Sequence, residues 1–151
     1  MERLSIASFL ANGHDYHLYV YGEIENAPPG AVLKAADEIL PKSMIFQYKN
    51  YPSYAGFSNF FRYKLLLCKG GWWADTDVVC LKPFVFEDVY VFASEKIDGC
   101  PVPTTAVIKM PVGSEIMQFN YRVCPLCPDP SDVVWGEHGP RLMATAITNV
   151  A

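Results

Sequence analysis

The sequence lacks several features that define large classes of proteins. Lysine and arginine number 12 against 16 aspartates and glutamates, so the net charge of −4 gives no basic excess for binding nucleic acid. Charged residues are only 19% and hydrophobic residues 51%, a balance that excludes a disordered chain. The apolar stretch from Leu4 to Ala11 is short and contains serines, so the sequence predicts no transmembrane segment and no signal peptide.

Cysteine is also scarce, and its pattern excludes a secreted disulfide framework. The five cysteines are an odd number, and we expect Cys68 and Cys80 to lie in core segments. The one C-x-x-C, at 124–127, has neither a second cysteine pair nor the spaced histidines that a zinc site needs. Prolines around it indicate an irregular loop with two ordinary thiols.

Helix and strand signals alternate along a chain of 151 residues, a length that suits one domain spanning 1–151. We expect strands at 16–21, 45–48, 90–93 and 106–109, and helices at 4–11, 57–69, 114–122 (capped by Ser114) and 139–148 (with Pro140 in its first turn). Such alternation predicts an α/β fold whose functional site lies at the carboxyl ends of strands.

Asp75-Thr76-Asp77 ends an apolar run and is the most informative motif. On an extended segment, residues i and i+2 project to the same side, so both carboxylates would reach one cation. So sparse a set of hard oxygen ligands suits Mg²⁺ or Mn²⁺, which complete their shell with water and substrate phosphates. By itself the triplet also fits a solvated turn.

The segment before this triplet has the pattern of a helix buried on one face. The apolar stripe consists of Phe57, Phe61, Leu65 and Cys68. Ser58 is the expected N-cap, and Gly70 is expected to end the helix with a positive φ. Arg62 lies on this helix, from which its guanidinium could hold a phosphate or sugar hydroxyl, or pair as a surface arginine with a nearby carboxylate.

The residues from Ser58 to Leu67 and from Gly70 to Pro83 closely resemble the DXD-containing sugar-binding region of family 32-like glycosyltransferases. That group includes yeast Golgi mannosyltransferases and bacterial capsule or lipooligosaccharide transferases, and it is distantly similar to clostridial glucosylating toxins. The resemblance implies a GT-A-like fold, a mixed sheet flanked by helices. It also implies further strands before Met1 and after Ala151, so we expect this chain to hold an incomplete, central part of that fold.

The resemblance implies catalytic roles for three residues. Asp77 would be the main ligand of a Mn²⁺ or Mg²⁺ ion that bridges the two phosphates of the donor. Asp75 would contact the ribose or donor sugar and assist the metal. Arg62 would bind the donor sugar or help to neutralise the pyrophosphate.

Four further residues are implied to bind substrate. Asn59 stands where many members have an aspartate that contacts the donor sugar, and the amide keeps an acceptor oxygen without the charge. Trp73 would form part of the site wall, with core packing as the alternative. His138 and Gly139 belong to a segment similar to the family's glycine-proline motif near the donor, although a histidine before a helix is often structural.

The implied activity is the metal-dependent transfer of a sugar, with retention of configuration, from a UDP- or GDP-linked donor. The acceptor would be a glycan or lipid-linked saccharide, as in polysaccharide biosynthesis, and we expect a cytoplasmic enzyme peripheral to the membrane. Two other functions stay open. Asp75 and Asp77 also fit the motif of a haloacid-dehalogenase-type phosphatase, and the chain could be a non-catalytic remnant that binds a nucleotide or a partner.

Overall fold

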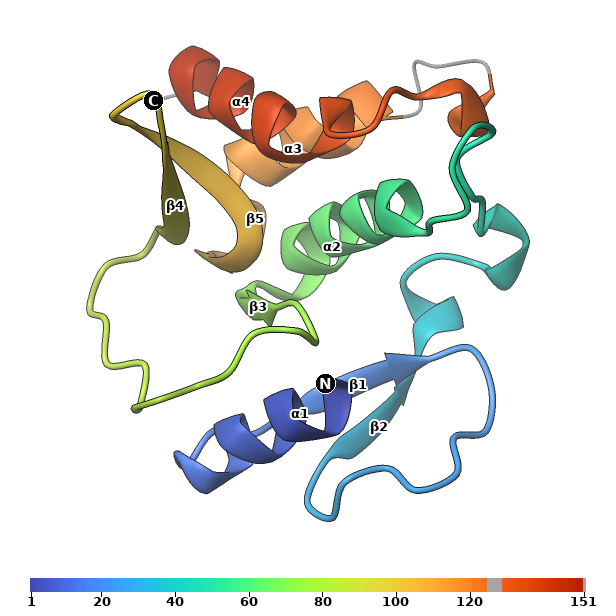
Figure 1. Cartoon of the computed structure of the whole chain (residues 1–151), viewed down its shortest axis with the longest axis vertical. Helices are drawn as coiled ribbons and strands as arrows, with labels where there is room; N and C mark the ends of the chain where they lie inside the picture. Colours follow the sequence, from blue (N-terminus) through green and yellow to red (C-terminus); the bar gives the residue numbers. More distant parts are fainter. Residues whose placement is uncertain (125–128, 151) are drawn as a thin grey trace.

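A computed structural model describes residues 1–124 and 129–150, which form a mixed α/β fold (Figure 1). Its helices are α1 (Glu2–Ala11), α2 (Ala55–Lys69), α3 (Glu115–Val123) and α4 (Leu142–Val150), and its strands are β1 (His17–Val20), β2 (Val32–Ala35), β3 (Gly71–Ala74), β4 (Val91–Ile97) and β5 (Cys100–Met110). The expected α/β class is confirmed. Within the described ranges, no helix is long and apolar enough to cross a membrane.

The strands fall into two sheets. β1 and β2 pair in parallel, from His17 opposite Val32 to Val20 opposite Ala35. The second sheet is antiparallel, with the order β3-β5-β4. The strands expected at 90–93 and 106–109 belong to a longer hairpin, because Asp98 and Gly99 both adopt positive φ angles (51° and 81°) and form a two-residue turn.

Helix α2 lies between helices α3 and α4 on one side and the β1–β2 sheet on the other, and it provides much of the core (Figure 1). The expectation that it is buried on one face only is wrong, since Asn59, Arg62 and Leu66 are buried as well as Phe57 and Phe61. Cys68 is exposed, contrary to expectation, because it lies in the last turn, where the helix emerges from the core; Cys80 is buried as expected.

The expected capping residues of the helices are only partly confirmed. Ser58 does not cap α2, which begins three residues earlier, where Ser53 Oγ accepts a hydrogen bond from the Ala55 amide at 3.2 Å. Ser114 caps α3 as expected, accepting from the Met117 amide. Pro140 lies in a wide turn, Glu137–Arg141, that precedes α4.

Two other local expectations had different outcomes. The strand expected at 45–48 is wrong, because only an isolated bridge joins Tyr48 to Tyr51 there. Most of the C-x-x-C motif, including Cys127, lies outside the described residues.

Gly70 sets the geometry between α2 and β3. Its φ of 63° ends the helix, and its amide donates to the Leu66 carbonyl at 2.9 Å. A Cβ at this position would lie 2.7 Å from the backbone nitrogen of Val112, so the chain passes too closely for any side chain. This tight turn brings the end of β3 beside the buried face of α2.

Candidate functional site

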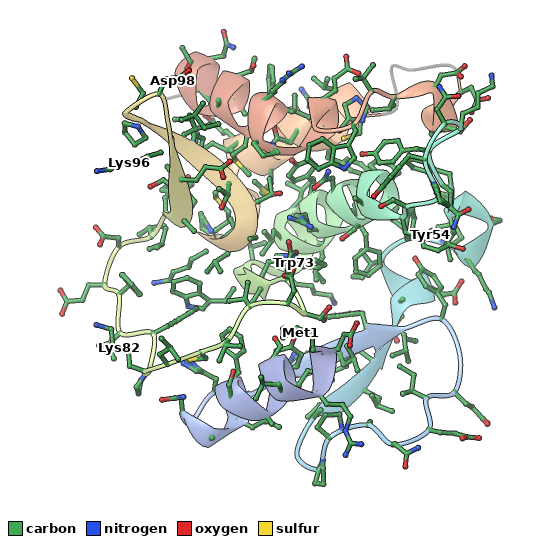
Figure 2. The ribbon with its side chains drawn as sticks, viewed as in Figure 1. Met1, Tyr54, Trp73, Lys82, Lys96 and Asp98 are labelled. Carbon is green, nitrogen blue, oxygen red and sulfur yellow. The ribbon has the colours of Figure 1, made fainter. Side chains whose placement is uncertain are left out.

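A cleft of about 1080 Å³ lies between the α1–β1–β2 layer and the unit formed by α2 and β3. Arg62, Trp73 and the acidic triplet 75–77 line one wall, and His14 and Tyr16 line the opposite wall. In the view of Figure 2, Trp73 lies near the centre of the molecule, whereas Asp98 lies on the distant hairpin turn. The cleft therefore brings together several residues that the sequence singled out.

Asp75 is fixed at the carboxyl end of β3. Its amide donates to the carbonyl of Ala106 at 2.8 Å, which continues the β3–β5 pairing by one residue. Its Oδ1 accepts from Trp73 Nε1 at 2.6 Å and from Arg62 Nη2 at 2.9 Å. Among the described residues Oδ2 has no hydrogen-bond partner, and the side chain is 29% exposed.

Arg62 is held almost entirely by the protein. Its Nη1 donates to the carbonyl of Thr105, its Nη2 donates to Ser58 Oγ at 3.2 Å, and its guanidinium carbon lies 4.9 Å from the centre of the Trp73 ring. The side chain is only 5% exposed. Both Nη atoms are therefore engaged within the protein, and a role for Arg62 in binding the donor stays a prediction.

A bulge in β5 makes the Thr105 carbonyl available to Arg62. Phe92 pairs with Ile108, and Ser94 pairs with Pro103, so one residue of β4 faces four residues of β5, 104–107. Thr105 has no registered partner on β3 or β4. Such bulges redirect backbone groups away from the ladder, and this one aims a carbonyl at a buried guanidinium.

Burial and pairing act in opposite directions on the two charges. Burial raises the pKa of Asp75, an effect that the Arg62 charge and the Trp73 hydrogen bond oppose. Burial likewise lowers the pKa of Arg62, which the Asp75 charge opposes. Since the charges of Arg62 and Asp75 compensate each other, the carboxylate of Asp77 gives this wall of the cleft its negative charge.

Asp77 lies in a turn, so the premise that the triplet is extended is wrong. The Val78 amide donates to the Asp75 carbonyl at 3.1 Å and closes this turn. Asp77 is nevertheless exposed and lines the same cleft as Asp75. In the described part of the chain no three His, Cys, Asp or Glu side chains converge. A metal site at Asp75 and Asp77 stays a prediction.

Asn59, His138 and Gly139 lie together, but not among the residues that line the cleft. Tyr63 Oη donates to the His138 carbonyl at 2.7 Å, and a Cβ on Gly139 would lie 3.4 Å from Asn59 Nδ2. Thr105 Oγ1 donates weakly to Asn59 Oδ1, at 3.5 Å. A role for these residues in binding substrate stays a prediction.

His14 and Tyr16 are cleft residues that the sequence did not single out. Burial raises the pKa of Tyr16, and the negative charge of Asp75 raises it further, which places the phenol within the field of the acidic wall. Both residues precede β1, whereas the rule for parallel strands directs attention to carboxyl ends. The polar Asn-Gly-His segment after an apolar helix was the available signal.

Asp129 and Asp132, the acidic pair considered as the second motif of a phosphatase, lie away from this cleft. Asp132 pairs with Lys49 at 3.0 Å on the surface, and Asp129 accepts from the Ser131 amide at 3.0 Å. Neither residue is among those that line the cleft with Asp75.

A family model described as the glycosyltransferase sugar-binding region containing the DXD motif matches residues 6–97, more than half of the chain. The match runs from α1 to the end of β4 and includes Arg62, Asp75 and Asp77. No curated protein and no solved structure matches the chain.

Proposed function

The chain belongs to the family of glycosyltransferase sugar-binding regions that contain a DXD motif, and from this we propose that it transfers a sugar from a nucleotide-diphosphate donor to a hydroxyl group. The donor is UDP- or GDP-linked, and the acceptor is a glycan or lipid-linked saccharide. The observation that carries the proposal is the cleft in which Asp75, held on one oxygen, lies beside the exposed Asp77.

The acidic wall is suited to Mn²⁺ or Mg²⁺. Asp77 would be the main protein ligand, and Asp75 would assist through Oδ2, the oxygen that neither Arg62 nor Trp73 occupies. A divalent ion bound there supplies charge that stabilises the departing diphosphate.

The chain's own groups position the reactants. Arg62 and Trp73 fix the rotamer of Asp75, and the exposed part of the Trp73 indole offers an apolar surface to the donor sugar. We propose that Asn59, His138 and Gly139, which lie together outside the residues that line the cleft, also contribute to binding the donor. The acceptor hydroxyl would attack from the face that the diphosphate leaves, with retention of configuration, and we assign no covalent nucleophile.

We further propose that residues 1–151 act as one domain and that the reaction takes place in the cytoplasm, next to the membrane. Lipid-linked saccharides would meet the enzyme there. The proposal rests on the acceptor class and not on any membrane-spanning element.

Calorimetric titration with UDP and GDP, with and without Mn²⁺, tests the donor site. We expect binding that depends on Mn²⁺ and weakens by about tenfold or more in Asp77→Asn, because a charged ligand is lost. Asp98→Asn is the matched control: it makes the same chemical change on the distant hairpin turn, at a φ of 51° that asparagine accepts. It should bind as the wild type does.

Two outcomes would overturn the proposal. A folded wild-type protein that binds neither nucleotide in the presence of Mn²⁺ would favour the non-catalytic remnant. Hydrolysis of a generic phosphate ester that is abolished in Asp75→Asn, with no nucleotide binding, would favour the phosphatase.

A further inference from the structure

The segment from Val78 to Tyr90 follows the acidic triplet and contains neither helix nor strand (Figure 1). Leu81 and Val85 are 87% and 84% exposed, whereas Cys80 is 3% exposed and Phe84 is half-buried. The segment is therefore anchored at Cys80 and Phe84, and farther along it Lys109 Nζ donates to the carbonyls of Phe86 and Asp88 at 2.9 and 2.8 Å.

The anchors at Cys80 and Phe84 are both made to α1 and the turn after it. The Cys80 amide donates to Ser8 Oγ at 2.8 Å, and the Cys80 carbonyl accepts from Asn12 Nδ2 at 3.0 Å. The Phe84 amide donates to His14 Nε2 at 3.0 Å. Since Nε2 is the acceptor, the imidazole is neutral and carries its proton on Nδ1.

Aromatic packing reinforces the second attachment. The Phe84 ring meets Phe9 edge-on, with centroids 5.4 Å apart, and its centroid lies 5.4 Å from that of His14 and 4.9 Å from that of Trp72. Phe84 thus connects α1 to β3 across the end of the cleft.

These attachments determine where Asp77 can lie. On one side, Asp75 is fixed by Ala106, Arg62 and Trp73; on the other, Cys80 is fixed by α1. Among the described residues the side chain of Asp77 has no hydrogen-bond partner of its own, so its position depends on the anchors on either side of it, of which Cys80 is the nearer and the Phe84–His14 contact the next along the segment.

We propose that His14 is a positioning residue: its neutral Nε2 anchors Phe84, and together with Ser8 and Asn12 it holds the segment after the acidic triplet so that Asp77 faces the cleft. The anchoring is independent of the proposed function, whereas its consequence for ligand binding rests on it.

Two substitutions separate the hydrogen bond of His14 from its packing. His14→Phe keeps a ring against Phe9 and Phe84 but removes the acceptor. His14→Gln keeps an acceptor oxygen at about the position of Nε2. Lys96→Gln, at an exposed position on the distant β4–β5 hairpin and outside the cleft, is the control (Figure 2).

Amide hydrogen exchange, measured by NMR, reports on both ends of the anchored segment. In His14→Phe we expect the Phe84 and Val78 amides to exchange about fivefold or more faster, because a hydrogen bond worth about 1 kcal/mol is lost and the turn loosens. The Gly70 amide, bonded within α2, should be unchanged, and His14→Gln should restore most of the protection.

The Mn²⁺-dependent affinity for nucleotide should follow the same order: reduced in His14→Phe, restored in His14→Gln, and unchanged in Lys96→Gln. Unchanged exchange of Phe84 or Val78 in His14→Phe would overturn the proposal, and so would faster exchange with undiminished nucleotide affinity. A wild-type protein that binds no nucleotide would contradict only the proposed function. The exchange rate of the Val78 amide would still decide whether His14 positions the turn that holds Asp77.

Discussion

The Arg62–Asp75 pair provides the sharpest test of how this site is built. Removing one partner of a buried ion pair costs about 3–5 kcal/mol, because the other charge is left without compensation. The two partners differ here: the Arg62 side chain is 5% exposed and that of Asp75 is 29% exposed. The cost should therefore depend on which of them is removed.

Asp75→Ala leaves the guanidinium with the Thr105 carbonyl and Ser58 Oγ but without an anion. We expect a loss of about 3 kcal/mol in the free energy of unfolding, at the lower end of the range because water can enter where Asp75 was. Arg62→Met removes the buried charge together with its desolvation cost, and leaves the Thr105 carbonyl without its donor. We expect this change to cost about 2 kcal/mol.

The double variant should cost about 3 kcal/mol, less than the two single changes together, because neither charge is then stranded. The resulting coupling is about 2 kcal/mol, which a double-mutant cycle resolves. Urea unfolding followed by far-UV circular dichroism measures all four proteins, with extrapolation to water. Asp132→Ala, which removes an exposed pair with Lys49, is the control and should leave stability unchanged within error.

Two results would refute this reasoning. Additive costs in the cycle would mean that Arg62 and Asp75 do not interact in solution as their 2.9 Å contact indicates. An Asp75→Ala variant as stable as the wild type would mean that the guanidinium is hydrated and not buried.

Two further predictions concern the turn after α2 and the buried histidine. Gly70→Ala should lower the free energy of unfolding by more than about 2 kcal/mol, because φ is 63° there and the new Cβ would lie 2.7 Å from the Val112 nitrogen. Gly71→Ala, where φ is 86° but no atom lies nearby, should cost only about 1 kcal/mol in the same urea assay. Equal costs for the two variants would contradict the close approach of Gly70 to Val112. Burial lowers the pKa of His138, so folding favours the neutral ring, and stability should fall as the pH drops below 6.5 towards the lower pKa of the folded state. His138→Gln should remove this pH dependence of the free energy of unfolding, which is at most about 1.4 kcal/mol per pH unit, and the control His17→Gln should retain it. If stability varied with pH in the same way in the wild type and in His138→Gln, burial of His138 would not disfavour its charged form.

Much of the local structure followed from the sequence because its causes are local. Ser114 caps α3 since a serine hydroxyl satisfies the amide three residues later. Gly70 ends α2 because glycine accepts a positive φ. The hairpin turn at Asp98 and Gly99 carries a strong local signal as well, although the expected strands stopped short of it.

The start of α2 and the burial of its polar face did not follow from local pattern. Helix α2 extends back to Ala55 because Ser53 supplies an acceptor before it, and Ser58 instead accepts from Arg62. Where a helix begins can thus depend on which partner is near in space. Cys68 fits the apolar stripe equally well, yet the core ends one turn before it.

The sequence by itself determined the family, the acidic triplet and the helix–glycine–strand unit that presents it, since these depend on residue types at fixed spacing. Only the tertiary structure decided that Arg62 forms a buried ion pair with Asp75, that Asp77 lies in a turn, and that α1 anchors the segment after that turn. Each of these depends on contacts between residues distant in sequence: a bulge in β5 aims the Thr105 carbonyl at Arg62, and His14 meets Phe84 seventy residues away. Such contacts are set by packing of the whole chain, which no local spacing encodes.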